Sequence, residues 1–271
     1  VVYSLTAEPT VSFWDSGEYI LTSAKLQVGH PPGAPLYQML GAVFSSIALE
    51  QNQVGYVMNL MSGVASAFTI LFMFFSTSIL LQKITSKINN KKNQDFLILL
   101  SSSIASLTFT FTDTFWFNAV ETEVYAMATL IMSLLFYLGL RWELEMNQPR
   151  GNRWLILISF VVGLSFGVHF MGLLTIPAIG LIYFFKNYKP ITIKKFIIAN
   201  IAVVSVLLIV FKLLAPNILR YFSILEVFFV NSIGLPFNSG TIIAGILLVC
   251  FFYYFLSYTV KNNLKTLNTI T

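Results

Sequence analysis

The chain is short of charged residues and of cysteine. Asp, Glu, Lys and Arg make up only 10% of its 271 residues, whereas a soluble domain carries roughly 25%. The single cysteine, Cys250, excludes a disulfide framework or a cysteine metal site within the chain. Glycine-rich phosphate loops, zinc helix motifs and nucleophile elbows are missing as well. Use of a cytosolic nucleotide is therefore unsupported.

Apolar and aromatic residues dominate instead. The residues AVILMFWYC form 56% of the chain, 26 residues are Phe, and mean hydropathy is +0.78. This composition predicts an all-α polytopic membrane protein that has the lipid bilayer as a partner. The net charge of +5 does not indicate nucleic acid, because Lys and Arg sit in short clusters between apolar runs.

A membrane span needs about 20 apolar residues. Candidate spans lie at residues 54–81, 96–111, 122–140, 196–214 and 241–260. The run 154–185 is too long for one span, and we expect residues 167–172 to split it in two. Residues 1–5 are typical of the last turn of an incomplete first span. We therefore expect one transmembrane domain over 1–271, a fragment of a longer protein, with about seven further spans.

Two earlier segments are shorter and amphipathic. Between residues 15 and 28 the polar residues Asp15, Glu18, Thr22 and Lys25 fall on one helical stripe. After a proline-rich break, residues 35–48 repeat apolar side chains at helical spacing. Both segments are expected to be helices that lie in the membrane interface.

The basic residues indicate the topology. If Leu5 leaves the membrane on the outside, thirteen of sixteen basic residues fall inside, as the positive-inside rule requires. These are Lys83, Lys87, Lys91, Lys92, Arg141, Arg150, Arg153, Lys186, Lys189, Lys194, Lys195, Lys261 and Lys265. Most acidic residues fall outside, so we expect any chemistry on the non-cytoplasmic face.

Asp15 and Glu18 are three residues apart and share one helix face. One of them can act as a general base. The same spacing also fits an ordinary helix start with Asp15 near the cap, so spacing leaves both interpretations open.

Two histidines are further candidates. His30 lies in a rigid turn with three prolines and two glycines, where it can bind a phosphate or a sugar hydroxyl or serve only structure. His169 falls at the expected turn between two short spans, beside Gly167 and Gly172 that permit close packing.

The remaining candidates are outer acids and one arginine. Asp113, Glu121 and Glu123 lie in an expected outer loop that can hold an acceptor or a metal, although acids also favour a helix N-terminus. Arg220 lies in an expected outer loop at 215–240. Either a lipid phosphate or snorkelling to the interface explains an arginine there.

Residues 10–20 (TVSFWDSGEYI) and 25–36 (KLQVGHPPGAPL) closely resemble a family of bacterial membrane proteins described as a domain of unknown function. That family is related to the endoplasmic-reticulum transmembrane protein O-mannosyltransferase that acts on plexin-type domains. Further matches lie at 112–117, 120–126, 163–169 and 231–239. The resemblance implies a GT-C superfamily glycosyltransferase with a carboxylate base in its first outer loop, Asp15 first and Glu18 beside it.

The resemblance also implies a reaction. A sugar, with mannose one candidate, would pass with inversion from a polyprenyl-phosphate donor to a Ser or Thr hydroxyl of an exported protein. Cationic or hydrogen-bonding groups would stabilise the departing phosphate, and His30, His169 and Arg220 are the candidates that we name for this role. The active face would be the periplasmic side of the bacterial inner membrane. No metal ligand is assigned, and a divalent metal is left open.

A transporter or flippase of a lipid-linked or ionic substrate is the alternative function. It predicts acidic residues deep within the spans and discontinuous helices near the midplane. A non-catalytic membrane scaffold is a third interpretation, under which Asp15 would be replaceable.

Overall fold

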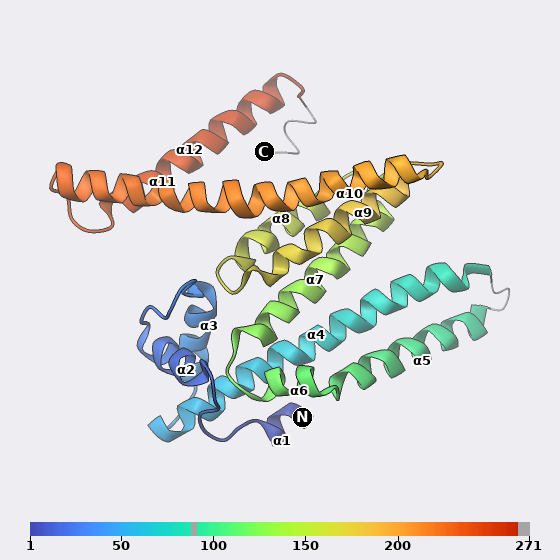
Figure 1. The fold of residues 1–271 in the computed structure, drawn as a ribbon, viewed down its shortest axis with the longest axis horizontal. Coiled ribbons are helices and arrows are strands. Elements are labelled where there is room, and N and C mark those ends of the chain that lie inside the picture. Colours follow the sequence, from blue (N-terminus) through green and yellow to red (C-terminus); the bar gives the residue numbers. More distant parts are fainter. Residues whose placement is uncertain (88–90, 265–271) are drawn as a thin grey trace. The chain divides into compact units, whose positions relative to one another are not determined.

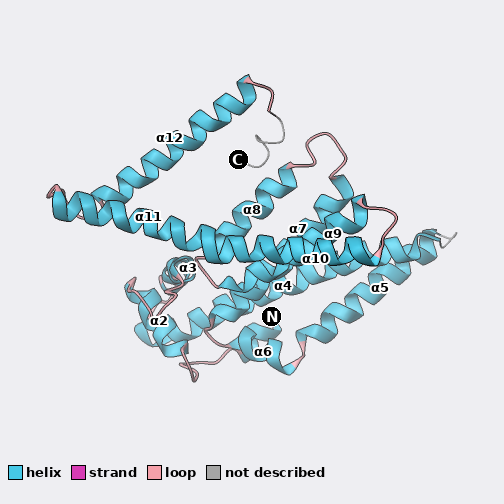
Figure 2. Cartoon of the chain, turned by 45° about the horizontal axis from the view of Figure 1, so that its top comes forward, coloured by secondary structure: helices cyan, strands magenta, loops and turns pink. Residues whose placement is uncertain are grey.

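The computed structural model describes residues 1–87 and 91–264, and every regular element in these ranges is a helix (Figure 2). The all-α prediction is therefore confirmed. Where the sequence predicted one domain, the contacts divide the chain into two compact units, Val1–Ile191 and Thr192–Thr271. Each unit is described by itself.

The first unit begins with three short helices, α1 (Val2–Thr6), α2 (Ser16–Lys25) and α3 (Pro35–Ser45). Helix α2 ends where Leu26 adopts a left-handed conformation, with φ of 48°. Pro35 occupies the first turn of α3, where its missing N–H costs no helical hydrogen bond. Helices α2 and α3 pack against each other, and both match the segments expected at 15–28 and 35–48.

Longer helices follow: α4 (Val54–Ile84) after the short turn η1 (Gln51–Gln53), then η2 (Thr85–Lys87), α5 (Lys91–Thr110) and α7 (Val124–Glu145). Helix α4 packs against both α5 and α7 (Figure 1). The centre of the unit is apolar, with Met58 on α4 and Ala128 and Leu135 on α7 fully buried.

The expected outer loop around Asp113 is instead helical, forming α6 (Asp113–Val120) at 66° to α5. The extended backbone of Thr112 interrupts the helix, and Asp113 then begins a new one with an acid in its first turn. Phe115 and Ala119, four residues apart, bury one face of α6 against Tyr3. This burial explains why the segment folds as a helix.

The predicted break within 154–185 is confirmed. Helix α8 (Arg153–Ser165) is followed by η3 (Phe170–Leu174) and α9 (Thr175–Asn187), with residues 166–169 between them. Both α8 and α9 pack on α7.

In the second unit, the prediction of an outer loop over 215–240 is wrong for most of its length. Helix α10 (Ile193–Leu208), the π-helical turn η4 (Ile209–Leu214), α11 (Ala215–Val227) and the π-helical turn η5 (Phe228–Ser232) form one continuous helix. Pro216 is in the first turn of α11, where the wide π-turn before it accommodates the absent N–H. Helix α12 (Ser239–Lys261) packs against α11.

Five helical segments of the described chain are long and apolar enough to cross a membrane, and the bent pair α5 and α6 makes a sixth if it is one span. Helix α8 is a shorter apolar helix. The protein is therefore an integral membrane protein, and each of the seven expected spans coincides with a helix.

Charged groups at one end of the first unit agree with the expected topology. Lys83 at the end of α4 contacts Glu143, and Arg153 at the start of α8 donates to Glu145 at 2.6 Å. These ends were all predicted to be cytoplasmic. Lys265, from the same prediction, lies outside the described residues.

Candidate functional site

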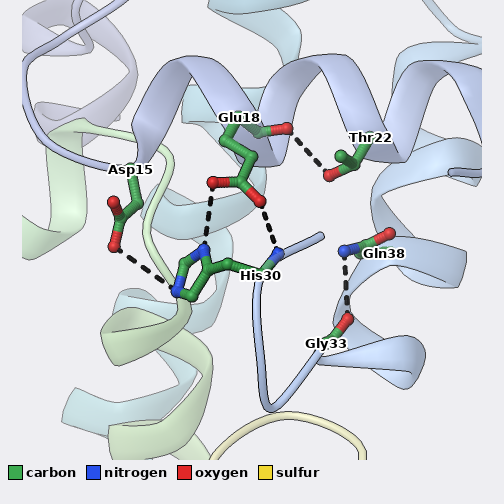
Figure 3. Close-up of polar contacts among 6 residues, drawn as sticks. All are labelled: Asp15, Glu18, Thr22, His30, Gly33 and Gln38. Carbon is green, nitrogen blue, oxygen red and sulfur yellow. Dashed lines mark hydrogen bonds and ion pairs between the residues drawn. The ribbon is translucent and has the colours of Figure 1, made fainter. Parts of the chain in front are cut away.

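Asp15 immediately precedes α2 and faces the proline-rich turn. It occupies the N-cap position, but its side chain makes no capping hydrogen bond. Its Oδ2 instead lies 3.7 Å from Nε2 of His30, and the carboxylate is 56% exposed (Figure 3). Trp14 before it has a φ of 60°, an unfavourable left-handed conformation that often occurs at functional sites. Asp15 therefore stands at the helix start, as one of the two interpretations of the sequence expected, but its side chain does not cap the helix.

Glu18 is bonded to His30 through both of its carboxylate oxygens. Oε1 accepts the His30 backbone N–H at 2.6 Å, and Oε2 lies 3.0 Å from Nδ1 of the ring. The imidazole thus lies between the two acids, with one nitrogen toward each (Figure 3). Two charged hydrogen bonds of this kind fasten the turn to α2.

The contacts change the proton affinity of both partners. The backbone N–H of His30, followed by its side chain, lowers the pKa of Glu18 below its ordinary value. The hydrogen bond to Glu18 raises the pKa of His30, against partial desolvation, and the charges of Glu18, Asp15 and Glu123 raise it further. An imidazolium is therefore favoured between the two carboxylates.

The turn that carries His30 is held from its other side by α3 and by the segment before His169. The Gln38 side chain donates to the Gly33 carbonyl at 3.0 Å, and the Leu36 N–H donates to the Gly167 carbonyl at 2.8 Å. A Cβ at Gly29 would lie 2.8 Å from the Gln38 amide nitrogen and 3.1 Å from Glu18. Glycine therefore allows the turn to approach α2.

Glu123, at the start of α7, joins the same group. Its side chain is buried near the backbone N–H groups of Asp15 and Val124, which favour its charged form. Burial, followed by the charges of Asp15 and Glu121, raises the pKa of Glu123 to about 7. Glu123 is thus the one acid of the expected outer loop that lies near the Asp15 and Glu18 pair.

The other predicted acids lie elsewhere. Glu121 is half-buried and bonds to the Ser12 side chain, and burial raises its pKa. Asp113 is exposed at the start of α6, in a hollow that it lines with Trp116 and Phe117. Among the described contacts, neither belongs to the group around His30.

His169 and Arg220 also lie apart from that group. The Nδ1 of His169 accepts the Met171 N–H at 3.1 Å and so caps η3, its ring faces Tyr125 at 5.4 Å, and burial lowers its pKa. These contacts agree with a structural histidine at a turn. Arg220 lies on α11 in the second unit, on a helix rather than in the expected loop.

Asn59 is an important residue that the sequence analysis missed. Fully buried on α4, it donates to the carbonyls of Glu8 at 2.6 Å and Thr10 at 3.0 Å, and it accepts from Thr122 at 2.5 Å. It thereby joins the segment before Asp15 to the segment before Glu123. An amide inside an apolar run was the available signal, because such a group is costly without partners.

Two buried tyrosines, Tyr19 and Tyr37, pack next to the site. Tyr19 on α2 packs edge-on against Tyr37 on α3 with ring centroids 5.3 Å apart, and its ring lies 5.9 Å from that of His30. Burial, with a contribution from the nearby carboxylates, raises the pKa of Tyr19 to about 12. Tyr19 therefore stays neutral at physiological pH.

Three side chains have the chemistry and spacing of metal ligands. Asp15, Glu18 and His30 each offer one ligand atom, and these atoms lie within 4.8 Å of one another. Two carboxylates and an imidazole are ligands for ions such as Mn²⁺ or Zn²⁺. A bound ion would have to replace the hydrogen bond between Glu18 and the His30 ring.

An apolar groove lies beside α2. Its volume is about 830 Å³, and it runs between α2 and the end of α3. Gly17, Leu21, Ala24 and Ala42 line it, with Lys25 as its charged residue. Asp15, Glu18 and His30 are not among the residues that line the groove.

Comparison with known proteins agrees with the family resemblance seen in the sequence. The family model described as the protein O-mannosyl-transferase TMEM260 N-terminal domain matches residues 15–192. That range includes Asp15, Glu18, His30 and Glu123 but not Arg220.

Two curated relatives are similar to the chain. Protein O-mannosyl-transferase tmem260 of Dictyostelium discoideum is 29% identical over 140 residues, which is 51% of this chain and 15% of that protein. Protein O-mannosyl-transferase TMEM260 of Mus musculus is 25% identical over 169 residues, 60% of this chain and 21% of that protein. The match therefore spans about a fifth or less of each relative. No solved structure matches the chain.

Proposed function

The chain belongs to the protein O-mannosyl-transferase TMEM260 N-terminal domain family, and from this premise we propose that it is a membrane glycosyltransferase acting on protein. The names of the two relatives support transfer to a protein hydroxyl. In the finer form of the proposal, a polyprenyl-phosphate sugar, with mannose as the first candidate, is the donor. A Ser or Thr hydroxyl of an exported protein is the acceptor.

The proposal rests on one observation: the two acids of the first loop differ in their hydrogen-bond partners and in their exposure. Both oxygens of Glu18 are occupied by His30, whereas Asp15 is exposed and makes no capping bond. A general base must reach the acceptor hydroxyl. Asp15 is therefore our base, and Glu18 is the group that holds His30 in place.

In the proposed reaction, the acceptor oxygen attacks the anomeric carbon on the face opposite the phosphate. The new C–O bond forms as the bond to the phosphate oxygen breaks, and the acceptor proton passes to Asp15. The lipid phosphate leaves with the bonding electrons, and the anomeric configuration inverts. His30, as an imidazolium, supplies positive charge close to the leaving phosphate.

The groove beside α2 supports a lipid-linked donor. Its lining is mainly apolar, which suits a prenyl chain, and Lys25 can pair with a phosphate. The groove is lined by Gly17, Leu21 and Ala24, and Asp15 is not among its lining residues, so the prenyl chain would lie along a different face of α2 from the acids.

The charge pattern supports an active site on the non-cytoplasmic face. In a bacterial cell, as the sequence resemblance implies, this is the periplasmic face of the inner membrane. Asp113, His169 and Arg220 stay expectations for substrate binding, because the proposal does not depend on them.

The alternative of a transporter or flippase is less well supported. It predicts acids deep within spans. Asp15 precedes the short helix α2, Glu18 lies on it, and Glu123 precedes the first residue of α7. These positions favour chemistry at the membrane surface over passage through the membrane.

Substitution of Asp15 in the full-length protein tests the proposal. Asp15→Asn keeps the size of the side chain but cannot accept the proton, so transfer from a polyprenyl-phosphate sugar to protein should fall by about 10² to 10⁴. Glu50→Gln, an exposed acid before η1, is the control. Undiminished transfer by Asp15→Asn would rule out Asp15 as the base.

As an alternative to the imidazolium, a divalent metal could supply the positive charge, and we propose Asp15, Glu18 and a neutral His30 as its ligands. Such an ion would supply positive charge to the donor phosphate. Titration of the purified protein with Mn²⁺, followed by paramagnetic broadening of the His30 resonance, tests this. If Mn²⁺ does not broaden this resonance, or broadens it equally in Asp15→Asn, these three residues do not form a metal site.

A further inference from the structure

The first unit has a hollow beside α6 that the proposed reaction does not use. Its volume is about 520 Å³, and the residues that line it are Phe111, Asp113, Trp116 and Phe117. These four residues form the aromatic hollow. Phe111 is 58% exposed and Phe117 66% exposed, and Asp113 is exposed as well. Accessible aromatic rings therefore share this hollow with one carboxylate.

The rings of the aromatic hollow are held by packing. Trp116 stacks on Phe111 with ring centroids 5.7 Å apart and 25° between the ring planes. Tyr3 packs edge-on against Trp116 at 5.3 Å, and the Tyr3 hydroxyl donates to the Thr110 carbonyl at 2.9 Å. A site whose side chains are already ordered loses less conformational entropy when a ligand binds.

The lining favours a cation over a sugar. A cation within about 6 Å of an aromatic ring face is attracted by the ring quadrupole, most strongly by that of Trp. Asp113 adds a negative charge, and the Trp116 indole N–H is the other polar side-chain group of the lining. A sugar with several hydroxyls finds few partners there, whereas an ammonium or guanidinium group matches both the rings and the carboxylate.

The surrounding charge indicates which cation. On the predicted topology, the outer segments of the first unit carry one basic residue, Lys25, and seven acids. These acids are Glu8, Asp15, Glu18, Glu50, Asp113, Glu121 and Glu123. Such a surface attracts a basic protein segment. A lipid ammonium group brings a phosphate with it, and none of the described lining residues is basic and able to pair with that phosphate.

The aromatic hollow is connected to the region of the proposed base. Helix α6 has eight residues and is therefore about 12 Å long. At its far end the Val120 carbonyl accepts the Glu8 N–H at 2.9 Å, and Glu8 lies seven residues before Asp15. An extended acceptor segment advances about 3.3 Å per residue. A basic residue in the hollow would therefore lie several positions away from the hydroxyl that receives the sugar.

We propose that the aromatic hollow binds a Lys or Arg side chain of the acceptor protein, with the cation against the rings and paired with the Asp113 carboxylate. This inference rests on the proposed transfer of a sugar to protein. It gives Asp113 a defined part in substrate binding, as a residue that selects acceptors and does not take part in the chemistry.

Transfer to synthetic peptides by the full-length protein tests this selection. A set of Ser peptides carries Lys at successive positions from the Ser, and in matched peptides norleucine replaces Lys and removes only the charged amine. For the best position we expect wild type to have a KM about 10-fold lower for the Lys peptide. Asp113→Asn should reduce this ratio to about threefold or less, with little change in kcat. Phe117→Leu should reduce it as well, because the ring contributes to cation binding.

Two variants outside the hollow are the controls. Glu50→Gln removes an exposed acid that is also expected on the outer face. Phe96→Leu removes a ring that is 63% exposed on α5, away from the hollow. Both should keep the preference for Lys. Equal KM values for every Lys and norleucine pair in wild type, or the same loss of preference in Glu50→Gln as in Asp113→Asn, would overturn the inference.

A binding measurement is independent of transfer. The chain has four tryptophans, so labelling with 5-fluorotryptophan gives four fluorine signals, and Trp116→Phe identifies the signal of Trp116. A Lys peptide without Ser or Thr should shift this signal in wild type but not in Asp113→Asn, and its norleucine counterpart should not shift it. A shift caused by mannose, or by phosphatidylethanolamine in nanodiscs, in place of the Lys peptide would overturn the assignment.

The outcomes separate this inference from the proposed function. If the protein transfers no sugar to any peptide or protein, the proposed function fails, and the fluorine titration still tells whether the hollow binds a basic side chain. If wild type glycosylates Lys and norleucine peptides equally well, the proposed function stands and the acceptor role of the hollow is wrong.

Discussion

Both carboxylate oxygens of Glu18 are bonded to His30, one to its backbone N–H and one to its ring. This contact distinguishes the roles of two acids that lie three residues apart and look equivalent in the sequence. Glu18 holds the turn that carries His30, and Asp15 is the acid that remains exposed beside the imidazole. The assignment of roles follows from the partners of the two acids rather than from their spacing.

Removal of the Glu18 charge should change the pH dependence of stability. The pKa of Glu18 is lowered from 4.5, so its contribution is present above pH 4.5 and is lost as the pH falls through the lowered pKa. The pKa of His30 is raised from 6.5, so its contribution is present below pH 6.5 and is lost as the pH rises through the raised pKa. The stability advantage of wild type over Glu18→Gln should therefore be greatest between pH 4.5 and 6.5.

Thermal unfolding in detergent over a range of pH measures that difference. Glu50→Gln serves as the control, since this acid lies outside the His30 group. A difference between wild type and Glu18→Gln that is constant from pH 4 to pH 9 would contradict the ion pair.

Substitution of Asn59 should destabilise the first unit. Asn59→Ala removes three hydrogen bonds of a buried side chain and leaves the Thr122 hydroxyl and two carbonyls without this partner, a loss of about 2 to 4 kcal/mol. Asn118→Ala is the matched control, because the half-buried Asn118 amide donates to the Thr114 carbonyl of its own helix and, among the described contacts, joins no other segment. Similar unfolding midpoints for the two variants would argue against a connecting role for Asn59.

The topology can be tested by cysteine labelling from either side of the membrane. In a Cys250→Ser background, Gln148→Cys and Asn118→Cys should react from opposite sides, because Asn118 on α6 precedes the expected span α7 and Gln148 follows it. Gln148 falls in an expected cytoplasmic loop. Labelling of both positions by the same impermeant reagent would overturn the predicted orientation.

Filling the groove beside α2 should weaken donor binding. Ala24→Phe places a ring among the residues that line the groove, so the KM for the lipid-linked donor should rise by about 10-fold with little change in kcat. Leu49→Phe, at an exposed site that does not line the groove, is the control. A lowered kcat with unchanged KM would indicate that the groove does not hold the donor.

Composition and hydrophobic periodicity were sufficient for the fold class and for most helices. The break at 166–169 and the two short helices after Asp15 were predictable because glycine, proline and amphipathic spacing act locally. Two segments that were predicted as loops, α6 and α11, are helices. The reason is tertiary packing at α6 and backbone geometry at α11. Burial of Phe115 and Ala119 made a helix of an expected loop, and a π-turn allowed the helix to continue past Pro216.

The sequence by itself determined that Asp15 and Glu18 share a helix face, since spacing along a helix fixes which side chains are neighbours. It could not determine what they face. Only the packing of α4 with α7 and of α2 with α3, together with the Asn59 connection, brings Glu123 to the Asp15 backbone and His30 between the two acids. Local periodicity carries no information about contacts between residues so distant in the chain, and these contacts decide which acid is available for chemistry.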